Sequence, residues 1–425
     1  MPTTRRQFIK LGAGMVTVGM VMPGVWLREA RAQSAERRIF VVIQLDGGND
    51  GLNTVIPYTD ARYYSLRPAL SFKDTELKDA QGNSTIISSE FGLHPELSDI
   101  KKLYDQNKVA IVLGVGYPNP NLSHFVSKDI WHTGELTGRA GEGWLGRYAD
   151  IALVNETGFV AAAIGGLPKS LFAEKAVIPN ISNFANYTFQ TDPRHAGDKN
   201  NKLNTFGKNY SRSFPAGSYL AELTRAGDGA VDGAALVQES VARYASTVTY
   251  PGPPNPLAPA LKMVAQLATT IPTADLFYVQ MGGFDHHSDQ IGSQQEPTNK
   301  LIGRHVNLLR YFSQAVNAFY ADMAEHGLAD KTVMMQLSEF GRRPNENASF
   351  GTDHGTSNVM FIIGDPVKGG LYGDQPSLEA MQLDDAGNQR FAVDFRQVYA
   401  TMLDKWLGVD SREVLGSPFG NLSFL

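Results

Sequence analysis

Short apolar runs recur along this chain, and several of them stop abruptly at a glycine or an acidic residue. They cover residues 39–45, 109–113, 275–281, 332–337 and 358–363. Runs of this length that are apolar on both faces are typical of strands buried in a parallel sheet. Apolar residues also recur at helical spacing, over residues 95–108, 301–325 and 393–406. Strands that alternate with helices predict an α/β fold, in which a mostly parallel central sheet carries helices on both faces.

The middle of the chain, about residues 150–260, follows a different pattern. It is rich in Asn, Gly, Ala and Ser, its periodicity is weak, and it ends in the proline-rich stretch 250–256. We expect an inserted cap region here, with loops and some helices. The predicted organisation is therefore one α/β domain over residues 33–425 that contains this insertion.

The first 32 residues read as an export signal and not as part of the fold. Arg5 and Arg6 lie in a run that resembles a twin-arginine box, and a modest apolar stretch with four glycines follows. Ala30-Arg31-Ala32 fits a cleavage site, which predicts a mature chain beginning at Gln33 and a periplasmic or secreted location. The expected partner is the twin-arginine translocase. The alternative is that the segment is retained as a membrane anchor, although it is short for a bilayer span, and no other stretch reaches that length.

Composition excludes several classes of function. The 425 residues contain no cysteine, which rules out disulfides, iron–sulfur clusters and a cysteine nucleophile. Lys and Arg number 38 against 43 Asp and Glu, without a basic block, so nucleic-acid binding is not expected. The chain also lacks a phosphate-binding loop, a His-Glu-x-x-His motif and a Gly-x-Ser-x-Gly elbow.

Residues that can bind metals fall directly after the predicted strands. Asp46 follows the first strand, Asp285 and His287 follow a later one, and Glu339 follows the next. His354 lies in a glycine-flanked loop before the last strand. In an open α/β sheet, ligands bind beyond the carboxyl ends of the strands, so these side chains should share one edge of the sheet.

Ser123 is a predicted helix N-cap, where backbone N–H groups and the helix dipole favour an anion. Acids, imidazoles and a hydroxyl around an anion site are the parts of a two-metal phosphoryl or sulfuryl hydrolase. Each part also has a plainer interpretation. Asp46 sits in turn-forming sequence, and Ser123 alone is more often a simple cap. We expect His124 and His132, eight residues apart, to serve packing or orientation.

The motifs in combination resemble a known family. They are Leu-Asp-Gly-Gly-Asn-Asp-Gly-Leu-Asn, Ser-His-Phe, Gly-Gly-Phe-Asp-His-His, Ser-Glu-Phe-Gly-Arg and Gly-Thr-Asp-His-Gly. Together they look like the domain-of-unknown-function 1501 family, over about residues 38–425. That family is typically exported by the twin-arginine route and is grouped with the alkaline phosphatase and sulfatase superfamily.

The resemblance implies a division of roles. Asp46 and Glu339 would bind one divalent ion, and Ser123 would be the nucleophile or its remnant. A second ion would be bound by the residues Asp285, His287 and His354. Zinc, manganese, magnesium and calcium all remain open as the metal. Arg342, just beyond Glu339, would be placed to clamp a tetrahedral anion.

Three departures from the superfamily pattern leave alternatives open. One is that the expected Asp-x-x-x-His spacing is here Asp285-His286-His287. The later acid of the superfamily is commonly followed by His, whereas Phe340 follows Glu339. Asp353-His354 resembles that Asp-His element, but it follows a polar loop, so we align His354 with the final histidine of the pattern.

Two functions follow from this pattern. The first is an exported, metal-dependent hydrolase of phosphate or sulfate esters, acting on a small molecule or a glycan. The second is a hydrolase fold that has lost catalysis and binds the cell envelope or a polysaccharide, with another exported protein as a possible partner.

Overall fold

The structure is a computed structural model. It describes residues 37–137, 141–154, 158–185, 187, 197–210, 213–215, 218–292, 295–296 and 298–425. The expected signal, residues 1–32, lies outside the described residues. Within the described ranges, none of the helices is both long enough and apolar enough to cross a membrane.

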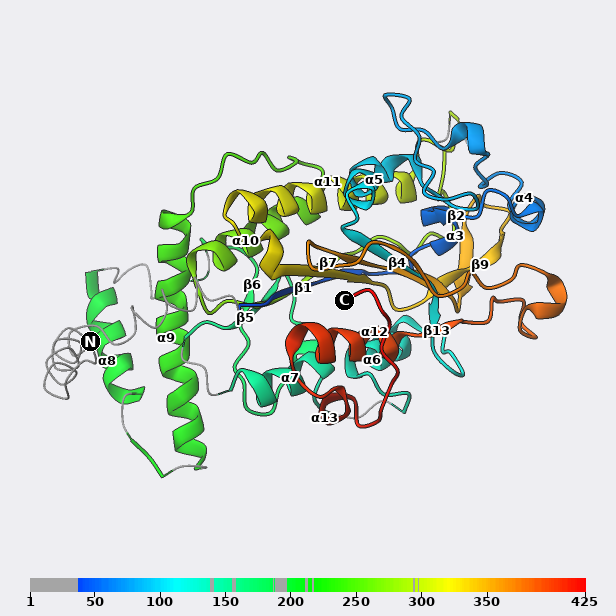
Figure 1. Cartoon of the computed structure of the whole chain (residues 1–425). Helices are drawn as coiled ribbons and strands as arrows, with labels where there is room; N and C mark the ends of the chain where they lie inside the picture. Colours follow the sequence, from blue (N-terminus) through cyan, green and yellow to red (C-terminus); the bar gives the residue numbers. More distant parts are fainter. Residues whose placement is uncertain are drawn as a thin grey trace, which may run out of the picture.

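A central sheet of nine strands runs through the described part of the chain (Figure 1). Its order is β12-β4-β11-β8-β1-β7-β5-β6, and β13 also pairs with β4. The strands are β1 (Ile39–Leu45), β4 (Val109–Gly116), β5 (Ala161–Ile164), β6 (Asn180–Ile181), β7 (Leu276–Met281), β8 (Thr332–Leu337), β11 (Asn358–Ile363), β12 (Gly370–Tyr372) and β13 (Val393–Asp394). The long apolar runs of the sequence are therefore strands, as predicted.

Most neighbouring strands are parallel, which confirms the predicted fold class. The central strand β1 pairs in parallel with both β7 and β8. Among the described strands of this sheet, β11 alone is antiparallel to its neighbours, β4 and β8. The reversal follows from a short antiparallel hairpin that precedes β11, made of β9 (Gly341–Glu346) and β10 (Thr352–Gly355). His354, expected in a loop, lies on β10.

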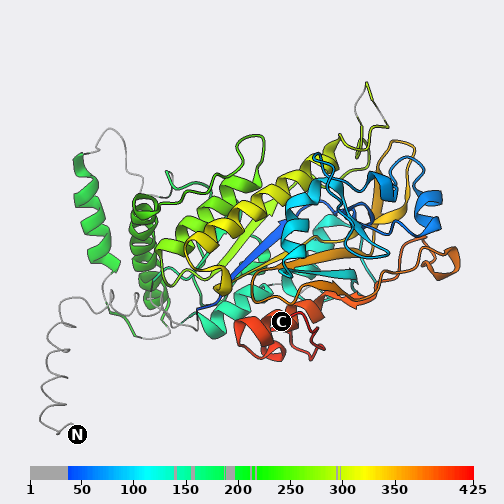
Figure 2. The ribbon, with the colours of Figure 1, turned by 45° about the horizontal axis from the view of Figure 1, so that its top comes forward.

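Helices cover both faces of the sheet, as expected (Figures 1 and 2). Side chains of β1 alternate between two apolar cores: Ile39, Val41 and Ile43 enter one, and Phe40 and Val42 enter the other. The first core is closed by α5 (Ser98–Asp105), α10 (Leu257–Thr270) and α11 (Arg304–Glu325). The second is closed by α6 (His124–Thr133), α7 (Trp144–Ala152), α12 (Phe395–Thr401) and α13 (Ser411–Leu415).

The expected insertion, residues 150–260, divides into two parts. Strands β5 and β6 join the central sheet, so this part belongs to the core. Helices α8 (Lys199–Tyr210) and α9 (Tyr219–Arg243) stand at the end of the molecule beyond β5 and β6 (Figure 1). The domain boundaries themselves remain a prediction.

Shorter elements complete the described chain. Between β1 and α5 lie α3 (Gly51–Thr54), β2 (Val55–Ile56), α4 (Ala61–Leu66), η1 (Asp74–Glu76), β3 (Gly92–Leu93) and η2 (Pro95–Leu97). Elsewhere lie η3 (Lys169–Leu171), η5 (Ala329–Lys331), η6 (Ala380–Gln382) and the π-helical segment η7 (Met402–Leu407). The helix expected over residues 393–406 is thus β13, α12 and η7 in succession.

Candidate metal centre and active site

Three parallel strands deliver acidic residues to one edge of the sheet. Leu45 of β1 pairs with Met281 of β7, and Gln44 pairs with Leu337 of β8, so the three strands end together. The loop after β1 then packs directly on the loop after β7. A Cβ at Gly47, whose φ is +122°, would lie 2.5 Å from the backbone nitrogen of Asp285. Only glycine permits this approach, which brings the two acid-bearing loops into contact.

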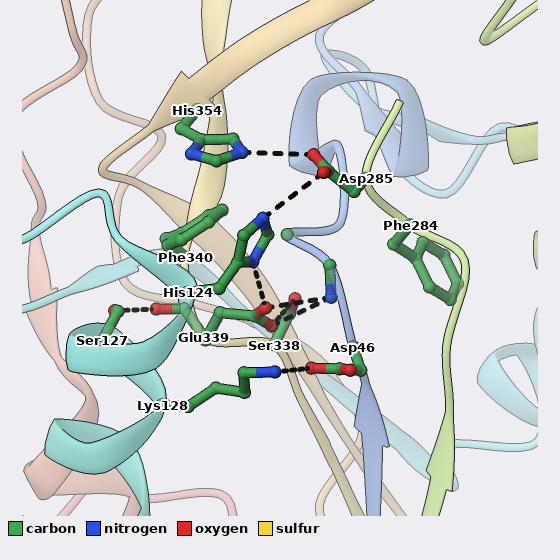
Figure 3. A network of polar contacts seen from close by, with 12 residues as sticks. Asp46, His124, Ser127, Lys128, Phe284, Asp285, Ser338, Glu339, Phe340 and His354 are labelled. Atoms are coloured by element: carbon green, nitrogen blue, oxygen red, sulfur yellow. Dashed lines mark hydrogen bonds and ion pairs between the residues drawn. The ribbon is translucent and has the colours of Figure 1, made fainter. Parts of the chain in front are cut away.

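Asp285 is the centre of the polar network in Figure 3. Its Oδ1 lies 2.8 Å from Nη2 of Arg342, 3.1 Å from Nε2 of His354 and 3.2 Å from Nε2 of His287. Its Oδ2 lies 3.5 Å from Nε2 of His124. Burial alone would raise the pKa of Asp285, but the hydrogen bonds from Arg342 and His354 outweigh it and hold the pKa well below its usual range. The carboxylate is therefore ionised.

His124, His287 and His354 form what we call the open histidine cluster. In each of them Nδ1 faces an oxygen that can only accept a hydrogen bond, so Nδ1 carries a proton. Nε2 points toward Asp285, to which it can donate a hydrogen bond, and a cation bound there would take the place of the proton on Nε2. The pairs are His124 with Glu339 Oε1 (2.8 Å), His354 with the carbonyl of Leu122 (2.8 Å), and His287 with Asp353 Oδ1 (3.2 Å). Histidine ligands of metal ions are held by outer-shell partners of this kind.

The inward-facing atoms fit a divalent cation. The ligand atoms of His124, Asp285 and His354 all lie within 4.8 Å of one another. Nε2 of His287 and Nε2 of His354 face each other at 3.0 Å, and the buried Nε2 of His124 has no hydrogen-bond partner among the described residues. Three imidazole nitrogens and one carboxylate are a donor set that zinc accepts readily.

The structure unites three of the predicted metal ligands, Asp285, His287 and His354, and adds His124. Sequence reasoning missed His124, which we expected to serve packing or orientation. The available signal was its position directly after the N-cap Ser123, at the start of a helix whose N-terminus meets the strand ends. The hydrogen bond to Glu339 raises the pKa of His124, and burial lowers that of His354.

Glu339 is fully buried beside this cluster. Its two carboxylate oxygens accept the backbone N–H of Gly47 (3.0 and 3.2 Å), and Oε1 also pairs with His124. The hydroxyl of Ser338 lies 3.3 Å from its Oε2. These contacts give Glu339 the geometry of an outer-shell partner that orients His124, whereas the sequence pattern predicted a direct ligand.

Asp46, the other residue expected to hold a second ion, contacts a lysine. Nζ of Lys128, on α6, lies 3.0 Å from its Oδ1, and Nε2 of Gln44 lies 3.3 Å from the same oxygen. Figure 3 shows Asp46 and Lys128 on one side of Glu339, and His124 and His354 on the other.

Arg342 is buried, with a fractional exposure of 2%. Its guanidinium donates to the carbonyls of Gly48 (2.8 Å), Thr352 (2.8 Å), Phe284 (3.0 Å) and Gly47, as well as to Asp285. A guanidinium with these partners ties the strand-end loops together and fixes Asp285. This geometry differs from the anion clamp that the sequence predicted for Arg342.

Ser123 occupies the N-cap of α6, as predicted. Its hydroxyl makes no capping hydrogen bond, its backbone N–H donates to Oδ1 of Asn121 (2.8 Å), and the residue is exposed. The Ser123 side chain therefore does not cap α6. An exposed hydroxyl next to His124 remains a candidate nucleophile.

A second group of histidines, His94, His286 and His305, lies next to this site, and we call it the buried histidine cluster. The ring of His305 is 5.7 Å from that of His286 and 6.1 Å from that of His94. Burial lowers the pKa of His94 and of His286 to about 3. Nearby, burial alone would raise the pKa of Asp50, but Arg67 at 2.7 Å outweighs it and lowers the pKa to about 2.

Comparison with known protein families finds a match to the C-terminal part of the chain. The family model described as "Protein of unknown function (DUF1501)" matches residues 258–423. None of the curated proteins matches the chain in sequence.

The chain was also matched to solved structures. One is a protein in the alkaline phosphatase superfamily from Vibrio parahaemolyticus, with 10% identity, coverage of 92% of this chain and 72% of that chain, and a TM-score of 0.34. Another is the C-terminal periplasmic domain of EcEptC from Escherichia coli in complex with Zn, with 8% identity, 78% and 75% coverage, and a TM-score of 0.37. A third is the PsFucS1 sulfatase from Pseudoalteromonas sp., with 13% identity, 93% and 73% coverage, and a TM-score of 0.36. The resemblance to the DUF1501 family that the sequence motifs indicate is confirmed by the family model over residues 258–423.

Proposed function

We propose that this chain is a metal-dependent hydrolase of phosphate or sulfate esters, with its metal ligands in the open histidine cluster and Asp285. One observation carries the proposal. Three imidazoles, each anchored through Nδ1, turn Nε2 toward one ionised carboxylate at the carboxyl edge of a mostly parallel sheet. A cation bound there would be a common partner for the three Nε2 atoms, two of which, in His287 and His354, lie 3.0 Å apart.

The chain's own groups have distinct roles in this proposal. A divalent ion bound there would supply a Lewis acid for the ester oxygens. Ser123 is the proposed nucleophile, because its hydroxyl is exposed at the N-terminus of α6, where free backbone N–H groups favour an anion. Arg342 holds Asp285 in place, and Glu339 holds His124.

Export completes the proposal. Residues 1–32 would direct the folded protein through the twin-arginine translocase to the periplasm or the medium, and the substrate would be a small-molecule or glycan ester. Replacing both Arg5 and Arg6 with Lys should leave the protein in the cytoplasm. Cell fractionation tests this, and an unchanged distribution would contradict the assignment.

Activity is tested on protein loaded with zinc or manganese and assayed with aryl phosphate and aryl sulfate esters. We expect chelation to abolish turnover, Asp285→Asn to remove the metal, and Ser123→Ala to abolish turnover with metal content unchanged. Ser417→Ala, at another exposed serine, is the matched control. A wild-type protein that retains no metal after desalting would refute the proposal.

The second candidate is a binding protein in which catalysis has been lost, favoured by Phe340 in the position of the expected histidine. Its ring packs on His124 and His354, with centroids 4.8 and 4.5 Å apart, and it offers no ligand atom. Such a protein should bind a glycan or an exported partner equally well after chelation and after Ser123→Ala, whereas the hydrolase should not.

A further inference from the structure

Among the described residues, the candidate ligand group for a metal ion contains His124, Asp285 and His354 but not Asp46. Glu339, which the sequence pattern predicted as the second ligand of an ion at Asp46, has both carboxylate oxygens hydrogen-bonded to Gly47, Ser338 and His124. The next residue along, Phe340, is apolar. What Asp46 has instead is the ammonium group of Lys128, 3.0 Å away.

The fold places this ammonium through regular helix geometry. His124, Lys128 and His132 are four residues apart on α6, so they share one face of the helix. That face lies along the strand ends, where His124 meets Asp285 and His132 meets the side-chain oxygen of Gln44 at 2.9 Å. Lys128, between them, is directed at Asp46.

Solvent still reaches the pair, because the Lys128 side chain is 27% exposed and that of Asp46 is 36% exposed. An ammonium group has three N–H donors, and Asp46 takes one. The remaining donors are available to an oxyanion that enters beside the open histidine cluster. An exposed ion pair such as Lys128–Asp46 contributes little to the stability of a fold. Binding of an anion is therefore the role that we consider for Lys128.

Building on the proposed function, we infer that Lys128 supplies the second positive charge of this site. Its ammonium, held by Asp46, takes the place of a second metal ion, so the chain holds one divalent ion and binds the anionic ester group between that ion and Lys128. This replaces the two-ion site that the sequence pattern predicted with a site of one ion and one lysine.

Metal stoichiometry tests the first half of the inference. Wild type, Asp46→Asn and Asp285→Asn are loaded with zinc, desalted and analysed by elemental mass spectrometry. We expect about one zinc per chain for wild type, the same for Asp46→Asn, and a large loss for Asp285→Asn, because one zinc ion takes three or four protein ligands and Asp285 is one of those proposed here. Two ions in wild type that fall to one in Asp46→Asn would overturn the inference while leaving a metal-dependent hydrolase intact. No bound ion in wild type would refute the proposed function and this inference with it.

Anion binding tests the second half, with inorganic phosphate as the probe and calorimetry on the zinc-loaded protein. Lys128→Met should weaken phosphate binding by about 10-fold to 100-fold with zinc content unchanged, since a charge-assisted hydrogen bond is lost. Lys128→Arg should recover part of the affinity, and Lys78→Met, at an exposed lysine elsewhere, should not change it. Lys128→Met with wild-type affinity, or a wild type that does not bind phosphate, would overturn the role of Lys128.

Discussion

The open and the buried histidine clusters use the same residue type for opposite purposes. His286 and His287 are neighbours in sequence, yet His287 is exposed and directs Nε2 at Asp285, whereas His286 is 1% exposed. Neither ring nitrogen of His286 has a hydrogen-bond partner among the described residues. Two histidines adjacent in sequence therefore place one ring at the site and the other in the interior.

What separates the clusters is the partner of each ring. In the open cluster every Nδ1 meets an oxygen acceptor, which leaves Nε2 as a potential ligand. In the buried cluster the Nδ1 of His94 accepts the backbone N–H of Glu96 at 3.1 Å, and burial keeps the ring neutral. Counting histidines cannot distinguish a metal site from a packed interior, whereas the direction of their hydrogen bonds can. Substitutions in the two clusters should therefore separate metal binding from stability.

The largest expected effect is on stability, at the ion pair beside the buried cluster. Arg67→Met leaves the Asp50 carboxylate buried without its partner, which should lower the free energy of unfolding by about 3–5 kcal/mol. Urea denaturation of the metal-free protein measures it. Arg62→Met, on the helix α4 that Arg67 caps, is the matched control, because the Arg62–Glu379 pair is exposed and should contribute little. Equal losses in the two variants would contradict the importance of burial here.

The next prediction compares metal binding and stability after one histidine is removed from each cluster. His354→Ala should weaken zinc binding by more than about 100-fold, beyond the usual cost of losing an outer-shell group, with little change in unfolding. His305→Ala should do the reverse. It leaves Asn49, whose side chain pairs with His305 at 3.1 Å, without that partner and should cost about 1–3 kcal/mol of stability. Zinc titration and denaturation of both variants would show whether the effects separate, and a joint loss in either variant would remove the distinction.

A smaller effect on zinc affinity is expected at Glu339, which hydrogen-bonds to His124 on the side away from Asp285. Glu339→Gln removes the carboxylate that fixes the tautomer of His124, so zinc affinity should fall by about 10-fold to 100-fold. Glu346→Gln, at an acid that accepts backbone N–H groups of Ala69 and Leu70 outside the site, should leave zinc affinity unchanged. Competition with a zinc indicator measures both. If Glu339 were a direct ligand, its loss would match that of His354→Ala.

Much of the fold could be predicted from the sequence because it rests on local patterns. Apolar runs over residues 39–45, 332–337 and 358–363 became β1, β8 and β11 with the same bounds, since strands buried on both faces have an unambiguous composition. The direction of β11 could not be predicted, because it depends on the hairpin before it. It could also not be predicted that β5 and β6 belong to the sheet, because these strands are short and lie in sequence of weak periodicity.

The site was predictable to the extent that strand ends converge. Asp285, His287 and His354 meet, although residues 287 and 354 are far apart in the chain. The separation of Asp46 from them was not predictable, because it depends on which face of α6 turns toward the sheet. That orientation brings Lys128 to Asp46 and His124 to Asp285, and periodicity alone fixes the spacing of a helix face but not what it meets.

The last prediction concerns the pH dependence of stability. Burial lowers the pKa of His94 in the folded protein from its usual 6.5 to about 3. Between pH 6.5 and 3 the unfolded chain therefore binds a proton at this site that the folded chain does not, so His94 makes stability fall as the pH drops. The slope should approach about 1.4 kcal/mol per pH unit in the middle of this range.

His94→Asn removes the titrating ring but keeps a good N-cap for the backbone N–H of Glu96. The stability of wild type should thus fall more steeply than that of His94→Asn between pH 6 and pH 4, in denaturant titrations with chelator present. Parallel curves would mean that burial does not keep His94 neutral, and the contrast between the two clusters would then rest on geometry alone.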